Sequence, residues 1–215
     1  FNPEQLVEML ENVKPPVAQL ALEGDEWKEH YRGELLLYEN VDPSETYYIG
    51  ADVSMGIRGG DWSVAQVLTS GKKQVATFRS QVHPDYFATI LYHMGIFFNE
   101  AQIAVENNGH GLLTVTRLGK DMAYPNMYLE TVVDKITDKE TIKLGFTTSV
   151  KTKPLIIDTL RADLREKVIE INDKITLREM MTFVVENNGS MGAEAGCHDD
   201  TIMSLALCNY INQGQ

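Results

Sequence analysis

The sequence contains only two cysteines, no apolar run that approaches about 18 residues and no apolar leader behind a basic start. Cys197 and Cys208 fall at the two ends of a predicted helix, where a rise of about 1.5 Å per residue separates them by roughly 16 Å. That separation argues against a disulfide between them. The missing apolar segments lead us to expect a soluble, cytosolic protein that does not enter a membrane. Because the sequence starts at Phe1 rather than at Met, we also expect a fragment of a longer chain.

Three patterns that mark common catalytic centres are missing as well. Without a GxxxxGK[ST] segment, the sequence has no Walker-type cradle for nucleotide phosphates. The five histidines lack the spacing of a zinc site, and no GxSxG segment marks a serine nucleophile. Cys197 stands beside His198 but lacks the separate partners that activate a thiol. A P-loop motor, a zinc centre and a serine or cysteine hydrolase are therefore disfavoured.

Positive charge is also scarce, because the formal net charge is −12. Proteins that bind nucleic acids normally carry a basic surface, so this balance at first argues against such a partner. The acids are concentrated at the start, since residues 1–45 hold eleven acids and three basic residues, whereas the remaining 170 residues carry only −4. Within 143–161, four basic residues stand against one acid. This makes a local basic strip, although solvated surface lysines are the simpler explanation.

The apolar patterns predict strands first and helices later. Residues 34–39, 47–53, 62–69 and 74–80 read as strands, with turns at 40–44 and 70–73 and a loop with three glycines at 56–61. After a peripheral helix at 3–10, helical spacing returns at 84–99, 111–118, 154–171, 177–183 and 201–211. Short strands are expected at 102–106, 127–129 and 184–186. At 215 residues, the chain is expected to form one large domain or a domain with an appendage. The order of segments predicts an α/β fold whose mixed sheet is flanked by helices.

Acidic residues stand where three of these segments end or begin. Asp52 ends the apolar run at 47–53, and Glu106 ends the run at 102–106. Asp199 and Asp200 open the last helix. Grouped in one place, these carboxylates would repel one another without a counter-ion. Carboxylate oxygens hold divalent metal ions, so the pattern indicates metal-dependent phosphodiester chemistry.

Each acidic position also has a simpler structural explanation. Asp52 alone, at the end of a strand, is more often a turn former. Glu106 could be paired with the two asparagines that follow it, without any metal. The tetrapeptide Glu-Asn-Asn-Gly recurs at 186–189, so it discriminates nothing by itself. The acids before 201–211 stabilise a helix N-terminus whether or not they bind a cation.

Two further segments suit contacts with phosphates. Lys151, Thr152 and Lys153 precede the helix predicted at 154–171, where lysines, hydroxyls and a helix N-terminus favour a phosphate. Ordinary helix capping is the simpler use of any one of them. Arg58 lies in the loop 54–61, whose glycines allow a phosphate backbone to approach closely or simply form turns.

Together, these segments resemble the C-terminal nuclease domain of the large terminase subunit of tailed bacteriophages. The resemblance covers about residues 33–212, and the ordered set is more specific than any single segment. The matching segments are 33–35, 48–56, 60–65, 105–109, 145–149, 152–154, 181–183 and 196–200, followed by the small and apolar residues of the last helix.

The resemblance implies an RNase H-like fold, of the resolvase and integrase type, and a metal-dependent endonuclease that cuts concatemeric double-stranded viral DNA. Mg²⁺ or Mn²⁺ is the expected cofactor, with two ions acting on the scissile phosphate. By motif position, the metal-binding and catalytic acids are Asp52, Glu106, Asp199 and Asp200, with a slight preference for Asp200 within the pair. Lys153 is a further expected catalytic residue. The expected DNA-contacting residues are Arg58, Lys151, Thr152 and Lys153.

The resemblance also implies partners and a location. Large terminases carry an N-terminal packaging ATPase, so residues 1–32 are expected to be a linker or a trailing segment of that ATPase, and residues 33–215 the nuclease domain. We expect the partners to be double-stranded viral DNA, the ATPase domain of the same chain, the portal and the small terminase subunit. We expect no membrane association, a monomeric isolated domain and a place in the host cytoplasm.

Other functions stay open at this stage. A Holliday-junction resolvase shares the expected fold and order of acids, but we would expect a basic dimer rather than a net charge of −12. An actin-like or sugar-kinase-like nucleotide-binding domain also begins with an Asp on a strand before a glycine-containing turn. Such a domain needs a second phosphate loop and an adenosine site, and neither is recognisable. A non-catalytic packaging scaffold is the third alternative.

Overall fold

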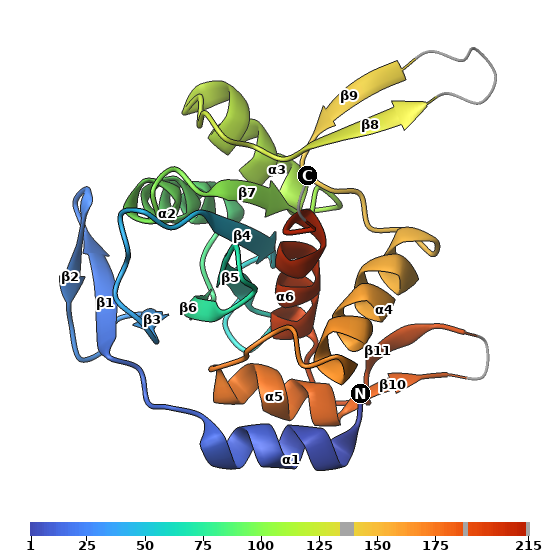
Figure 1. Ribbon diagram of the computed structural model, residues 1–215. Coiled ribbons are helices and arrows are strands. Elements are labelled where there is room, and N and C mark those ends of the chain that lie inside the picture. The colour runs from blue at the N-terminus through green and yellow to red at the C-terminus, as the bar shows by residue number, and fades with distance from the viewer. Residues whose placement is uncertain (134–139, 187–188, 214–215) are drawn as a thin grey trace.

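The computed structural model describes residues 1–133, 140–186 and 189–213, and Figure 1 shows its arrangement. Over these residues, no helix is both long and apolar enough to cross a bilayer. Cys197 and Cys208 are both free thiols, as their spacing predicted.

A seven-stranded sheet forms the centre of the domain (Figure 1). Its strands are β1 (Ala18–Glu23), β2 (Glu26–Glu29), β3 (Leu35–Leu37), β4 (Tyr47–Asp52), β5 (Ser63–Thr69), β6 (Gln74–Ser80) and β7 (Gln102–Val105). Their order across the sheet is β2-β1-β3-β6-β5-β4-β7. Every pair is antiparallel except β4 and β7, which run parallel at one edge. The carboxyl ends of β4 and β7 therefore meet at the same end of the sheet.

Helices cover both faces of this sheet, because the strand residues alternate between two hydrophobic cores. On one face, Ile49 and Val67 pack with α2 (Pro84–Phe97), and α3 (Gly111–Thr116) and the π-helical turn η1 (Arg117–Asp121) extend that layer. On the other face, Leu68 packs with α4 (Thr152–Arg165), α5 (Lys174–Met181) and α6 (Asp200–Ile211). The N-terminal helix α1 (Pro3–Asn12) lies against α5 and buries Leu6 (Figure 1).

Close packing fixes α6 directly over β4. A Cβ atom on Gly50 would lie 2.2 Å from the carbonyl oxygen of Ser204 and 2.3 Å from the backbone nitrogen of Cys208. Only glycine allows the helix to approach the strand this closely. This contact brings the start of α6 to the end of β4, where Asp52 lies.

Two hairpins complete the chain beside the main sheet. β8 (Leu129–Val133) pairs with β9 (Glu140–Leu144), and β10 (Phe183–Val185) pairs with β11 (Met191–Ala193). Both project from the helical layers in Figure 1.

The predicted mixed sheet with flanking helices is confirmed, and several predicted boundaries were wrong. The helix predicted at 154–171 ends at Arg165, because Lys167 adopts a left-handed backbone with φ 56°. The helix predicted at 177–183 spans Lys174–Met181 instead, because the Asp173 side chain caps it by accepting the backbone N–H groups of Ile175 and Thr176. The strands predicted at 127–129 and 184–186 are β8 and β10, which lie at Leu129–Val133 and Phe183–Val185.

Strands β1, β2, β9 and β11 did not emerge from the sequence. β2 and β9 are mostly exposed and lack an apolar face, and β11 has only three residues. β1 and β2 join the main sheet although they belong to the segment 1–32. The assignment of that segment to a linker or to the end of an ATPase stays a prediction.

Candidate metal centre

Two of the predicted acids lie side by side at the carboxyl end of the parallel strand pair. Asp52 is the last residue of β4, and Glu106 follows β7 directly. Ala51 pairs with Val105 in the parallel register, and the backbone N–H of Glu106 donates to the carbonyl of Ala51 at 2.9 Å. The fold therefore brings these two carboxyl groups into direct contact, although 54 positions separate them along the chain.

The electrostatics of this pair favour a cation between the acids. Burial raises the pKa of Asp52 well above its usual range, and the charge of Glu106 and a hydrogen bond to Glu106 raise it further. The charges of Asp200 and Asp199 act in the same direction. A carboxyl group raised in this way carries a proton that a divalent cation can replace.

The second pair of acids comes from the start of α6. Asp199 occupies the N-cap position, but its side chain accepts no hydrogen bond from the helix backbone. Its Oδ2 atom accepts instead from Nζ of Lys153 at 3.2 Å. Asp200 is buried, and its Oδ2 atom accepts from the backbone N–H of Trp62 at 3.1 Å. The two neighbouring carboxylates are thus held by different partners.

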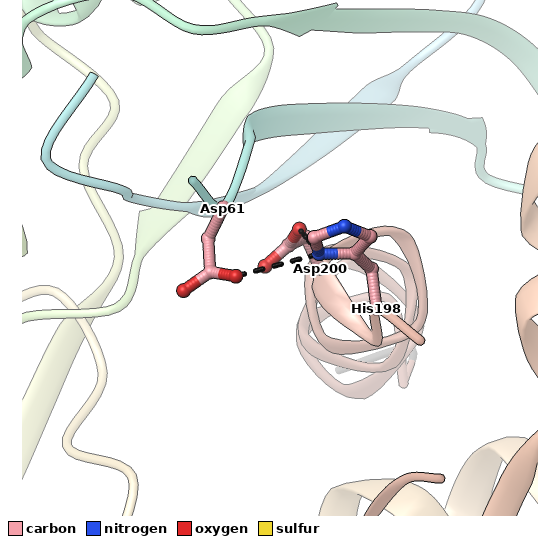
Figure 2. A group of neighbouring side chains, drawn as sticks. All are labelled: Asp61, His198 and Asp200. Atoms are coloured by element: carbon pink, nitrogen blue, oxygen red, sulfur yellow. Dashed lines mark ion pairs between the residues drawn. The ribbon is translucent and has the colours of Figure 1, made fainter. Parts of the chain in front are cut away.

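Asp61 and His198 join Asp200 in a compact group that the sequence analysis missed (Figure 2). Nδ1 of His198 lies 3.4 Å from Oδ1 of Asp61 and 3.6 Å from Oδ2 of Asp200. One ligand atom from each residue lies within 4.8 Å of the other two. His198 directly precedes the acid pair, so the sequence held a signal for it. Asp61 gave a weaker signal, since it ends a glycine-containing loop where an acid commonly forms a turn.

The surroundings of Asp200 shift its pKa. Burial is the largest influence and raises the pKa of Asp200 to about 6, and the charges of Asp61 and Glu179 add to it. The hydrogen bond from Trp62 and the nearby imidazole of His198 oppose this shift.

A single cleft of about 500 Å³ unites the acids. Of the predicted site residues, its walls include Asp52, Glu106, Lys153, Asp199 and Asp200, and they also include Asp61. Arg58, Lys151 and Thr152 do not line this cleft, although residues one or two positions away from each of them do. Arg58 and Lys151 are exposed.

Thr152 has a clear structural contact. Its hydroxyl donates to the carbonyl of Thr147 at 2.8 Å and accepts the backbone N–H of Ser149 at 2.8 Å. These hydrogen bonds shape the turn that begins α4 and thereby aim Lys153 into the cleft.

The residues present fit a divalent cation. The donors are carboxylate oxygens from four segments and one imidazole, which suits Mg²⁺ or Mn²⁺ and also admits softer transition metals. Lys153 is the basic residue in the cleft wall, and it forms an ion pair with Asp199. Among the ion pairs of the described residues, the other acids of the cleft have no lysine or arginine partner.

Solved structures of terminase nucleases share this architecture. The large terminase nuclease of the thermophilic phage G20c with bound magnesium has a TM-score of 0.66 and 20% identity, over 95% of this chain and 96% of that chain. The large terminase nuclease domain of Thermus phage P74-26 has a TM-score of 0.65 and 21% identity, over 98% of this chain and 96% of that chain. The G20c nuclease has also been solved with bound cobalt, at 21% identity, a TM-score of 0.66 and the same coverage as the magnesium form. No family model matches the sequence. The chain therefore has the fold of large terminase nuclease domains, and the predicted RNase H-like fold is confirmed.

Proposed function

We propose that this chain is the nuclease domain of a large terminase and cuts concatemeric double-stranded viral DNA during genome packaging. The observation that carries the proposal is the convergence of Asp52, Glu106, Asp199 and Asp200 in one cleft of a terminase-nuclease fold. An acidic cleft repels a phosphodiester unless cations lie between them. The same arrangement is therefore unsuited to DNA without metal and suited to it with metal.

Asp52 is the proposed shared ligand, because it contacts Glu106 and lies within the electrostatic influence of both acids of α6. Asp200 is the preferred partner within the pair, since Asp61 and His198 offer further donor atoms beside it. Asp199 is held by Lys153, so this lysine orients the acid or, once DNA enters, moves to a phosphate oxygen. Two bound Mg²⁺ or Mn²⁺ ions would supply a more acidic attacking water and a stabilised leaving 3′ oxygen.

Residues beside the cleft are proposed to hold the DNA. Arg58 lies on a loop next to the acids, Lys151 directly precedes α4 and Thr152 is the first residue of that helix. The side chains of Arg58 and Lys151 would contact the DNA backbone, and Thr152 would shape the start of α4. Such contacts position DNA without reading its sequence. The net charge of −12 implies weak DNA affinity of the domain alone. We propose that an ATPase domain of the same chain, the portal and the small terminase subunit bring DNA to this monomeric domain in the host cytoplasm.

Incubation with supercoiled plasmid and Mn²⁺ tests the proposed activity. Wild type should nick and linearise the plasmid, and Asp52→Asn should leave it intact. An intact plasmid with wild type, or equal cutting by Asp52→Asn, contradicts the nuclease assignment. Preferential cutting of a four-way junction over plasmid would favour a resolvase instead. Tight ATP binding without cutting would favour a nucleotide-binding domain.

A further inference from the structure

Helix α6 carries Asp199 and Asp200 but does not cap its own N-terminus. Asp199 stands at the N-cap position, where a side-chain oxygen usually accepts the N–H of the second or third helical residue. The Asp199 side chain makes no such bond, because its Oδ2 atom faces Lys153. The backbone carbonyl of Asp199 accepts the N–H of Ile202 at 3.0 Å, which leaves the N–H of Thr201 in the same turn in need of another acceptor.

Glu179 of α5 supplies that acceptor. Its Oε2 atom accepts the backbone N–H of Thr201 at 3.0 Å and also the hydroxyl of Thr201. Thr201 is the second residue of α6. Glu179 is only 8% exposed, so this bond is shielded from water. A carboxylate from a neighbouring helix thus performs the capping that Asp199 would otherwise perform, and it leaves both acids of α6 free to face the cleft.

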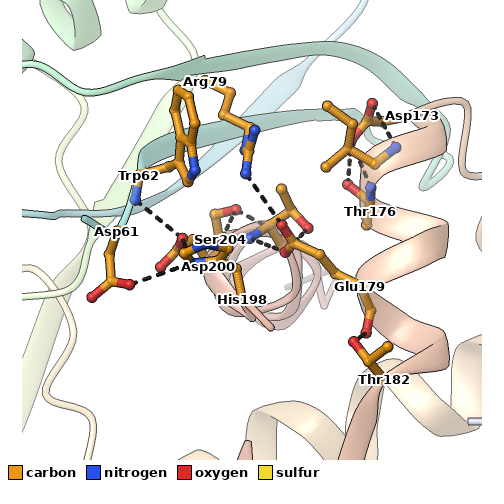
Figure 3. A network of polar contacts seen from close by, with 12 residues as sticks. Asp61, Trp62, Arg79, Asp173, Thr176, Glu179, Thr182, His198, Asp200 and Ser204 are labelled. Atoms are coloured by element: carbon orange, nitrogen blue, oxygen red, sulfur yellow. Dashed lines mark hydrogen bonds and ion pairs between the residues drawn. The ribbon is translucent and has the colours of Figure 1, made fainter. Parts of the chain in front are cut away.

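Arg79 connects this cap to the other partner of Asp200 (Figure 3). Nη2 of Arg79 lies 3.6 Å from Oε1 of Glu179. The guanidinium also stacks on the ring of Trp62, with its central carbon 3.9 Å from the ring centroid. The backbone N–H of Trp62 in turn donates to Asp200. These contacts form a closed ring. It runs from Glu179 to the start of α6 and Asp200, then to Trp62 and Arg79, and returns to Glu179.

The sheet fixes α5 at its other end as well. The buried amide of Gln66 on β5 donates to the hydroxyl of Thr176 on α5 at 2.9 Å and to the carbonyl of Thr201 on α6 at 3.3 Å. Helix α5 is therefore anchored to the sheet and to α6, and Glu179 has little freedom to move away from Thr201.

We propose that Glu179 and Arg79 are positioning residues for the metal centre: Glu179 caps α6 from outside, and Arg79 holds Glu179 and Trp62, so that Asp200 keeps one orientation. Neither residue lines the cleft that holds the acids. The inference rests on the proposed metal-dependent function. Partners that orient metal ligands typically contribute about 10- to 100-fold to metal affinity.

Direct Mn²⁺ binding, by electron paramagnetic resonance or calorimetry without DNA, tests this role. Glu179→Ala should weaken Mn²⁺ binding by about 10-fold or more, whereas Glu179→Gln, which keeps an oxygen for the Thr201 N–H, should stay within about threefold of wild type. Arg178→Ala, an exposed neighbour on the same helix, is the matched control and should bind like wild type. Circular dichroism at the titration temperature selects folded variants, and Arg79→Met gives an independent test from β6 with the same expected weakening.

The outcomes separate this inference from the function on which it rests. Wild-type affinity in both Glu179→Ala and Arg79→Met overturns the positioning role, and so does equal weakening by Glu179→Gln and Glu179→Ala. In that case the metal centre and the nuclease proposal stand if Asp200→Asn abolishes Mn²⁺ binding. If Asp200→Asn itself binds Mn²⁺ and cuts plasmid like wild type, the proposed metal centre is wrong.

Discussion

The same tetrapeptide, Glu-Asn-Asn-Gly, follows an apolar strand at 106–109 and again at 186–189, and the fold gives the two glutamates opposite surroundings. Glu106 lies at the end of β7, beside Asp52 on the parallel strand β4, and lines the acidic cleft. Glu186 is exposed beyond β10 in a two-stranded hairpin, where its backbone N–H donates to the carbonyl of Ser190. The local sequence is equal, so the difference comes from the neighbouring strand.

This comparison shows what a strand-ending acid means in this fold. At 106, the partner strand is parallel and ends on a second acid, so two carboxyl groups meet. At 186, the partner strand β11 is antiparallel and contains no acid. The tetrapeptide thus marks the end of a strand in both places. Only the sheet topology makes Glu106, rather than Glu186, a candidate metal ligand.

The largest expected difference between the two glutamates is in the rate of DNA cutting. Glu106→Gln should lower the rate of Mn²⁺-dependent plasmid cutting by about 1,000-fold or more, a loss of about 4 kcal/mol in transition-state stabilisation, because a ligand of the metal centre is lost. Glu186→Gln removes the same charge outside the cleft and should cut within about twofold of wild type. Equal rates in the two variants would remove the distinction drawn from the topology.

The sequence predicted the acids better than it predicted their surroundings. Strand endings and a helix start indicated Asp52, Glu106, Asp199 and Asp200, since periodicity and capping are local signals. Asp61 reaches Asp200 and His198 only because β5 pairs with β4 and α6 packs on Gly50, and these contacts are nonlocal. His198 lies two positions before Asp200, so its contact with this acid is local. The contact by which Glu179 of α5 caps α6 is also nonlocal, so the sequence did not predict it.

Metal-dependent stability gives the next effect. Mn²⁺ at about 1,000 times its dissociation constant should raise the free energy of unfolding of wild type by about 4 kcal/mol. Glu106→Gln should lose most of this gain, yet without metal it should unfold at a higher temperature than wild type, because one of two adjacent charges is gone. Glu186→Gln should follow wild type in both conditions. Thermal unfolding with EDTA or Mn²⁺ measures this, and lower stability of Glu106→Gln in EDTA would contradict the proposed repulsion.

The acids of the cleft also predict that the stability of the metal-free protein depends on pH. The pKa of Asp200 is raised from 3.8 to about 6 in the folded protein, so the stability it contributes is complete below pH 3.8 and is lost as the pH rises through about 6. The shift corresponds to a contribution on the order of 3 kcal/mol. The raised pKa of Asp52 acts with the same sign. In EDTA, urea unfolding should give a lower free energy at pH 7.5 than at pH 5.

Asp200→Asn provides the matching variant for that measurement. It should show a smaller loss of stability between pH 5 and pH 7.5, and Arg178→Ala should keep the wild-type loss. An equal loss in Asp200→Asn and wild type would exclude Asp200 as a source of the pH dependence.

The smallest expected effect concerns the side chains that hold each glutamate. The amide of Asn108 donates to Glu106 at 3.2 Å and to the carbonyl of Thr148 at 2.5 Å, and the hydroxyl of Ser190 donates to Glu186 at 3.2 Å. Asn108→Ala should weaken Mn²⁺ binding by about fivefold, because one hydrogen bond contributes about 1 kcal/mol to the orientation of Glu106. Ser190→Ala removes the corresponding contact from the hairpin and should leave Mn²⁺ affinity unchanged. Calorimetry measures Mn²⁺ binding by the two variants. If Asn108→Ala and Ser190→Ala bind Mn²⁺ equally well, the orientation of Glu106 does not contribute to the metal centre. The two copies of the tetrapeptide would then differ only in where their carboxylates lie.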